Sequence, residues 1–203
     1  MQEQDFSFFD NRGLIPPFLQ TPAHGDKSPY TISLTQFVCD FSIGCSRFDR
    51  AKRISILKGY LKYRSMLHDA GLTAGIQWVN GSFVTYKELI HNASPNDIDV
   101  LSIIMLPEGE SQQSFKDKNS ALFERKNLKD ELCVDANYLL LHPSKISLVE
   151  LLERVNYWNN LWSHERETLN WKGYFQIDLS PEEDLRAHAE LVNISKGVEN
   201  ETT

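Results

Sequence analysis

The chain has few cysteines and no long apolar run. Its three cysteines form an odd count without a C-x-x-C pair, which argues against a disulfide framework and against a cysteine-based zinc site. The longest apolar run is far too short to span a bilayer. The acidic, aromatic N-terminus lacks the basic start and apolar core of a signal peptide. We therefore expect a cytoplasmic protein with no membrane segment.

The chain also has little positive charge and none of several common catalytic motifs. Its formal net charge of -7 argues against nonspecific binding to nucleic acid, because phosphate backbones require clustered Lys and Arg. The P-loop, G-x-G-x-x-G, G-x-S-x-G and H-E-x-x-H patterns are absent from the sequence. What remains is an ordinary globular composition, with 41% hydrophobic and 24% charged residues in a length that suits one domain.

Apolar periodicity predicts alternating helices and strands, which makes the fold class α+β with a mixed sheet. Helical spacing is strongest between residues 46 and 70, and Ser147 with Glu150 forms a capping box before another apolar helix. The predicted helices are 46–70, 82–89, 111–130, 144–162 and one that begins at Pro181. The predicted strands are 75–79, 97–106, 132–141 and 173–179.

Proline and glycine content divides the chain around a single central domain. Residues 1–45 are expected to form an extended arm followed by a short helix, since prolines and glycines cluster between residues 13 and 30. The central domain spans 46–180. Residues 181–203 are expected to form a C-terminal helix and a disordered tail from Gly197 onward.

Two aspartates open the strand predicted at 97–106. Side chains at i and i+2 of a strand project from the same face, so Asp97 and Asp99 lie side by side. Each pKa should rise through mutual repulsion unless a cation sits between them. Carboxylate oxygens suit Mg²⁺, and the preceding Gly81-Ser82 turn offers N–H groups and a hydroxyl for a phosphate. The alternative is that both motifs are ordinary turn formers.

Asp135 places a third carboxylate inside the apolar strand predicted at 132–141. A lone buried carboxylate is costly unless it is paired or bound to a metal. The alternative is an edge position where Asp135 meets solvent. A dense positive cluster on the helix at 46–70 also has two interpretations, a solvated helix face or a surface for a triphosphate or RNA. The cluster comprises Arg47, Arg50, Lys52, Arg53, Lys58, Lys62 and Arg64.

Gly81-Ser82, the spacer 83–96, Asp97-Ile98-Asp99 and then Asp135 together resemble the nucleotidyltransferase superfamily, which has the DNA polymerase β-like fold. The similarity covers roughly residues 70–142 and is strongest to minimal prokaryotic members. It implies a nucleotidyltransferase-like central domain, with a mixed sheet and flanking helices.

The resemblance implies transfer of a nucleoside monophosphate from a nucleoside triphosphate (NTP) to an acceptor hydroxyl. Asp97, Asp99 and Asp135 would be the catalytic residues and the ligands of Mg²⁺ or Mn²⁺, and Gly81 and Ser82 would bind the triphosphate. A basic side chain on the 111–130 connection could also meet the triphosphate. The acceptor would be a protein, a tRNA or a small molecule. Minimal members of the superfamily suggest a toxin–antitoxin or antiviral-defence role.

Two other classes compete with an enzyme. The fold could be a non-catalytic binding module, such as an antitoxin or a complex subunit that keeps a nucleotide pocket. The acidic surface and the aromatic arm at residues 6–18 would then contact a protein partner. A third reading is a structural protein in which the two aspartates form only an edge turn.

Overall fold

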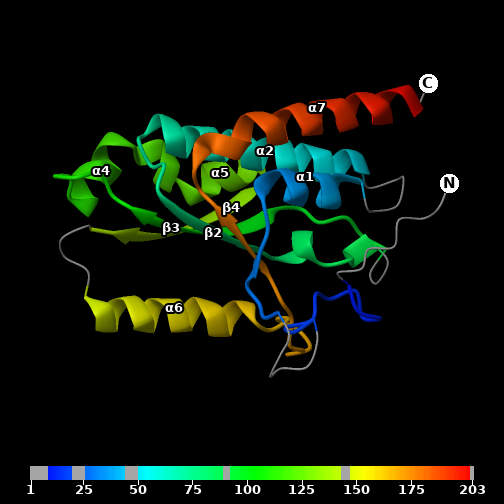
Figure 1. Cartoon of the computed structure of the whole chain (residues 1–203), viewed down its shortest axis with the longest axis horizontal. Helices are drawn as coiled ribbons and strands as arrows, with labels where there is room; N and C mark the ends of the chain where they lie inside the picture. The colour runs from blue at the N-terminus through cyan, green and yellow to red at the C-terminus, as the bar shows by residue number, and fades with distance from the viewer. Residues whose placement is uncertain (1–8, 20–25, 44–49, 89–91, 143–146, 202–203) are drawn as a thin grey trace.

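The protein is described by a computed structural model that covers residues 9–19, 26–43, 50–88, 92–142 and 147–201. Its centre is a five-stranded mixed sheet with the order β1-β5-β2-β3-β4 (Figure 1). The strands are β1 (Tyr30–Thr31), β2 (Gly75–Asn80), β3 (Ile98–Met105), β4 (Val134–Leu141) and β5 (Phe175–Asp178). β2 is antiparallel to both β3 and β5, whereas β3 is parallel to β4 and β1 to β5. The predicted α+β class and mixed sheet are confirmed.

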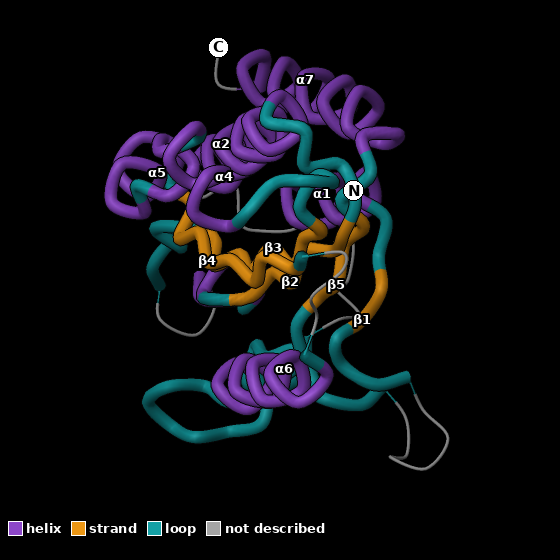
Figure 2. Tube along the Cα trace, turned by 90° about the vertical axis from the view of Figure 1, so that its left-hand side faces the viewer, coloured by secondary structure: helices purple, strands orange, loops and turns teal. Residues whose placement is uncertain are grey.

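Helices cover the two faces of the sheet unequally. One face is packed against α1 (Leu34–Ile43), α2 (Arg50–Asp69), α4 (Gln112–Lys118), α5 (Arg125–Leu132) and α7 (Asp184–Glu201). Figures 1 and 2 show α6 (Leu148–Trp162) alone on the opposite face. A large apolar core fills the first interface, and a smaller cluster built around Trp78, Trp162 and Tyr174 fills the second. No described helix is long and apolar enough to cross a membrane.

The positive cluster on α2 is partly buried. Arg53 and Arg64 have exposed fractions of 0%. Arg53 pairs with Glu88 and Arg64 with Asp184, at 2.9 and 2.7 Å respectively. The solvated-face interpretation is therefore wrong for these two residues. Each guanidinium carries several donors in a fixed fork, which lets it join α2 to neighbouring segments from inside the protein.

Several predicted elements have other bounds than the observed ones, and the strand predicted at 173–179 is the shorter β5. The helix expected over 111–130 is broken into α4, a 3₁₀ turn (Ser120–Phe123) and α5, because Asn119 and Glu124 leave the helical conformation. The helix expected over 82–89 begins as a 3₁₀ turn (Ser82–Val84) that ends at the extended Thr85, and residues 89–91 lie outside the described part. The strand expected from 132 starts at 134, because the left-handed Cys133 caps α5.

The described parts of the N-terminal arm and of the C-terminal segment pack onto the central domain. In the arm, Tyr30 and Thr31 form the short strand β1 beside β5, and α1 follows as expected. The aromatic Phe6 and Phe8 lie outside the described residues, whereas Phe9 stacks on Tyr86. At the other end, α7 continues to Glu201, so the disordered tail expected from Gly197 is wrong for residues 197–201. Val198 packs against the core there.

Candidate active site

The end of β2 and the starts of β3, β4 and β5 lie together along one side of the sheet, which we call the site edge and which runs across the strand ends. The antiparallel pairing of β2 with β3 places Asn80, the last residue of β2, opposite Asp99. The parallel pairing of β3 with β4 places Asp99 beside Asp135. Since β5 is antiparallel to β2, with Phe175 opposite Val79, the start of β5 lies at the same edge. The sheet therefore brings together residues that are far apart in the sequence.

The three predicted aspartates lie at this edge on the side of the sheet that carries α6. Asp99 alternates with Val100 and shares a face with Leu101, which belongs to the apolar cluster around Trp162 of α6. Asp135 lies on the same face of β4, two positions before Asn137 and four before Leu139. Together with Asp97, which precedes β3, these carboxylates form what we call the carboxylate site.

Gly81 contacts the carboxylate site directly. Its φ of 84° lies in the left-handed region that glycine tolerates best. A Cβ at this position would stand 1.8 Å from Oδ2 of Asp99, so any other residue here would displace that carboxylate. Gly81 therefore combines an unusual backbone conformation with a close contact to Asp99. The Ser82 hydroxyl that follows makes no hydrogen bond within the described chain.

Two cations of α5 neutralise two of the three carboxylates. Lys129 Nζ lies 2.5 Å from Oδ2 of Asp97 and 3.1 Å from Oδ2 of Asp135, so it bridges the two acids. Arg125 donates from Nε to Asp135. Arg125 and Lys129 are four residues apart and therefore share one face of the helix. Although β4 is the edge strand, Asp135 is only 7% exposed. The alternative in which Asp135 simply meets solvent is wrong.

The carboxylates of Asp99 and Asp135 differ in their electrostatics. Burial, with the nearby charges of Asp97 and Asp135, raises the pKa of Asp99 from 3.8 to about 6. Burial would also raise the pKa of Asp135, but the hydrogen bonds from Arg125 and Lys129 outweigh it and lower that pKa. Burial is the largest cause of the raised pKa of Asp99, and the expected repulsion between carboxylates contributes to it. Asp99 is the acid of this site that lacks an ion-pair partner within the described residues.

Lys172 belongs to the same edge and was not found by sequence reasoning. It lies just before β5, and its backbone N donates to Ser163 O at 2.8 Å. Its side chain is buried, with 8% of the residue exposed. Burial lowers the pKa of Lys172 to about 8 against the opposing effect of the Asp99 charge. The sequence signal is only a lysine beside a predicted strand, because the pairing of β5 with β2 cannot be read from spacing.

The segment after Gly81 is held in place from inside the protein. Arg53 of α2 donates from Nη1 to Phe83 O at 2.7 Å and from Nη2 to Thr85 O at 3.0 Å. Its ion pair with Glu88 anchors the far end of the same segment. Arg53 thus fixes the turn that carries Gly81 and Ser82. One member of the positive cluster on α2 therefore supports the site from behind.

The oxygen ligands at the carboxylate site are of the type that binds divalent cations. The carboxylate site offers hard oxygen ligands on adjacent strands, and the ammonium of Lys129 already lies between two of them. The amide oxygen Oδ1 of Asn80, opposite Asp99, is buried and has no hydrogen-bond partner. As the side chains of the described residues are placed, no three of Asp, Glu, His or Cys are grouped to hold a metal ion. The ligand types fit Mg²⁺ or Mn²⁺, with Lys129 standing in the place of a cation.

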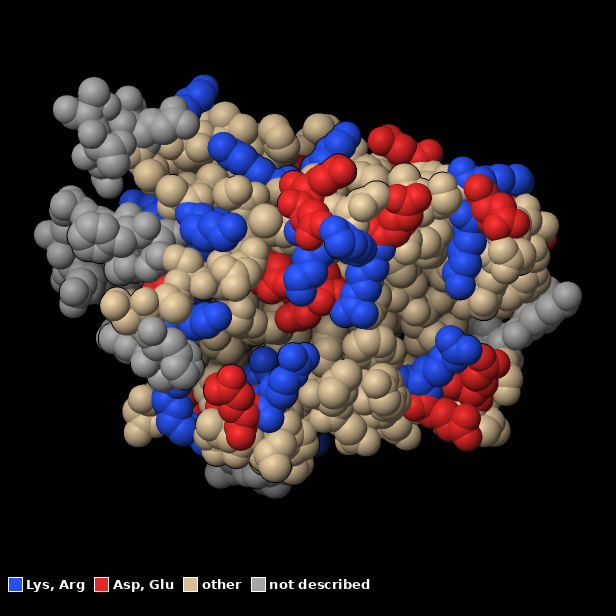
Figure 3. Space-filling model, turned by 180° about the vertical axis from the view of Figure 1, so that it is seen from behind, with Lys and Arg blue, Asp and Glu red and all other residues tan. Residues whose placement is uncertain are grey.

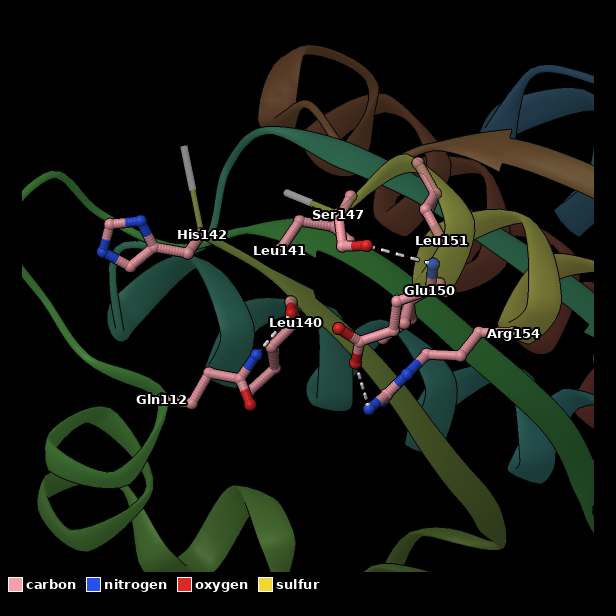
Figure 4. Close-up of a pocket in the computed structure, with 9 residues that line it drawn as sticks. Gln112, Leu140, Leu141, His142, Ser147, Glu150, Leu151 and Arg154 are labelled. Carbon is pink, nitrogen blue, oxygen red and sulfur yellow. Dashed lines mark hydrogen bonds and ion pairs between the residues drawn. The ribbon is translucent and has the colours of Figure 1, made fainter. Parts of the chain in front are cut away.

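The surface around the edge strand β4 carries mixed charge. Figure 3 shows this face, where acidic side chains near the centre are surrounded by Lys and Arg side chains. A small pocket lies at the other end of β4, where Leu140 and Leu141 meet α6 and Gln112 (Figure 4). Its charged lining pair, Glu150 and Arg154, is neutralised by an ion pair. The pocket lies at the opposite end of β4 from the candidate site at the carboxylates, and none of its lining residues belongs to that site.

Comparisons with known proteins assign a family to this arrangement. A sequence model of a family of unknown function, DUF6932, matches residues 7–178. The chain belongs to this family. The matched range contains the carboxylate site, the Gly81-Ser82 turn and Lys172, and it ends at the last residue of β5. No curated protein and no solved structure matches the chain. An activity therefore has to be argued from the geometry of the site.

Proposed function

We propose that the protein is a nucleotidyltransferase that moves a nucleoside monophosphate from an NTP to an acceptor hydroxyl. The observation that carries the proposal is the register of β2, β3 and β4. It places the Gly81-Ser82 turn, Asp99 and Asp135 next to one another at one edge of the sheet. The acceptor is a hydroxyl of a protein, a tRNA or a small molecule.

Each residue of the site has a role in this reaction. Asp97, Asp99 and Asp135 would hold Mg²⁺ or Mn²⁺, which supplies positive charge to the phosphates and lowers the pKa of the acceptor hydroxyl when it is bound. Gly81 and Ser82 would meet the terminal phosphates, because their turn offers backbone N–H groups and a hydroxyl. The exposed cations of α5, Arg125 and Lys129, can reach an anion placed over the carboxylates.

The atoms and electrons of this transfer balance without any further reactant. The acceptor oxygen forms a bond to the α-phosphorus of the NTP, and the bond from that phosphorus to the bridging oxygen breaks. Pyrophosphate leaves with the electron pair of the broken bond. The acceptor proton is taken up at Asp135 or by water, so a carboxylate near the acceptor oxygen assists the step.

The test supplies the protein with each α-labelled NTP in turn, Mg²⁺ and a cell extract. The proposal predicts that one or more nucleotides will label a discrete acceptor. The Asp97→Ala variant should give no label while it remains folded. Label that persists at the parent level in that variant would show that the reaction does not use this site.

One observation favours the second candidate, a non-catalytic nucleotide-binding or antitoxin module. Lys129 and Arg125 already compensate Asp97 and Asp135, so the site is largely neutralised without any ligand. Calorimetry with Mg²⁺ and an NTP distinguishes the two candidates when it is combined with the transfer assay. Binding without transfer to any acceptor would favour the module, whereas binding with transfer supports the enzyme.

A further inference from the structure

Lys172 approaches the carboxylate site from the side opposite to α5. Along the sheet edge the order is the start of β5, the end of β2, the start of β3 and the start of β4. Lys172 therefore lies on the side of the Gly81-Ser82 turn, whereas Arg125 and Lys129 lie on the side of Asp135. Neighbouring strands are about 4.8 Å apart, so β5 and β4 are separated by roughly 14 Å, and linked phosphates near Lys172 would cover only the β5–β2 part of this distance.

The backbone around Lys172 is fixed. The next residue, Gly173, donates to Ile15 O at 2.6 Å, and a Cβ on Gly173 would stand 2.7 Å from Pro16 O. A bridge between His164 and Trp171 closes the loop that precedes Lys172. The position of Lys172 is thus set by a tightly packed segment, and its charge interacts with that of Asp99. This position does not depend on the freedom of a surface loop.

The ammonium of Lys172 makes no ion pair or hydrogen bond within the described parts of the chain. Asp97 and Asp135 form ion pairs with cations of α5. Among the described residues of the site, Asp99 and Lys172 are the charged groups without an ion pair. A largely buried lysine without an ion pair costs free energy, whereas a methionine of similar shape would not. A lysine at this position is explained if an anion completes its environment.

We propose that Lys172 binds the phosphates of the NTP that leave as pyrophosphate, on the β2 side of the carboxylate site. This inference rests on the proposed function and adds a residue to it. The ammonium would contact the β- or γ-phosphate across the Gly81-Ser82 turn. Arg125 and Lys129 remain near the opposite end of the edge, beside Asp135.

The experiment measures binding of pyrophosphate and of nucleoside monophosphates, each with Mg²⁺, to the full chain. Lys172→Met is compared with the parent, with Lys172→Arg and with Lys126→Met, an exposed lysine that pairs only with Asp130. Lys172→Met should weaken pyrophosphate binding roughly tenfold or more, since it removes a charged hydrogen bond. Monophosphate binding and Mn²⁺ binding without nucleotide should hold. Lys172→Arg should recover part of the pyrophosphate affinity, and Lys126→Met should match the parent.

A thermal melt without ligand separates this role from a purely structural one. If Lys172 only compensated Asp99, Lys172→Met would melt at a lower temperature than the parent; the proposal predicts an equal or higher melting temperature. Equal pyrophosphate affinity of Lys172→Met and the parent would overturn the inference and leave the proposed function standing. A parent that binds Mn²⁺ but neither pyrophosphate nor any NTP would overturn both. Equal loss of monophosphate and pyrophosphate binding would also overturn the assignment to the leaving phosphates.

Discussion

Replacing Asp99 by Asn should stabilise the metal-free protein at neutral and alkaline pH. Burial, with the charges of Asp97 and Asp135, raises the pKa of Asp99 from 3.8 to about 6. A carboxyl whose pKa is raised by folding contributes most stability below pH 3.8 and loses it as the pH rises through 6. The difference corresponds to at most about 3 kcal/mol at pH 8, at roughly 1.4 kcal/mol per pKa unit.

The assay is a set of thermal and urea melts in EDTA between pH 4 and pH 8. For a protein of this size, a gain of about 2 kcal/mol raises the melting temperature by roughly 4–8 °C. The gain of Asp99→Asn should be largest at pH 8 and shrink towards pH 4. Asp130→Asn, an exposed acid that pairs with Lys126, serves as the matched control. A lower stability of Asp99→Asn than of the parent at pH 8 would show that Asp99 is a structural residue, and the interpretation as a metal ligand would fall.

Three further variants test the rest of the site. In calorimetry, Gly81→Ala should weaken binding of an NTP with Mg²⁺ more than Ser82→Ala does. The Cβ of the introduced alanine would collide with the carboxylate of Asp99. Ser82→Ala removes only one hydroxyl contact, which contributes about 1 kcal/mol. The affinity of Asp135→Asn for an NTP with Mg²⁺ should stay within roughly tenfold of the parent's. Its rate of nucleotide transfer in the labelling assay should fall on the order of a thousandfold. Equal transfer rates would show that Asp135 is not a catalytic residue. Lys129→Met should bind Mn²⁺ more tightly than the parent in an electron paramagnetic resonance titration, because the ammonium that bridges Asp97 and Asp135 is gone. The control Lys126→Met should bind Mn²⁺ like the parent. Weaker Mn²⁺ binding by Lys129→Met would contradict the view that its ammonium occupies a cation position.

The local part of the carboxylate site was predictable from sequence. Strand alternation alone places Asp97 and Asp99 on one face, and an acid inside an apolar run marks Asp135 as unusual. These inferences needed only neighbours in the chain, which is why they agree with the structure.

The partners of the carboxylates could not be assigned from sequence. The basic residues between 111 and 130 were recognised as candidates for an anion site, but the choice of Arg125 and Lys129 depends on how the connection folds. Breaks at Asn119 and Glu124 turn one expected helix into α4, a 3₁₀ turn and α5. Only after these breaks does a helix place two cations over the acids.

Long-range pairing decided the remaining differences. The burial of Arg53 depends on its contacts with Phe83 and Glu88, which lie on the turn after β2. Lys172 joins the site only because β5 pairs with β2 in the antiparallel sense. Periodicity within a segment carries no information on which strand lies next to it, so neither residue could be recognised from its own surroundings in the sequence.

The most direct test of the central claim is the transfer of label from an α-labelled NTP. Parent protein and Asp99→Asn are incubated side by side with Mg²⁺, a cell extract and each nucleotide in turn, and the products are separated by size. The account predicts a labelled acceptor and released pyrophosphate with the parent, and neither with Asp99→Asn. A parent that labels nothing with any nucleotide, or label that survives in Asp99→Asn at the parent level, would contradict it.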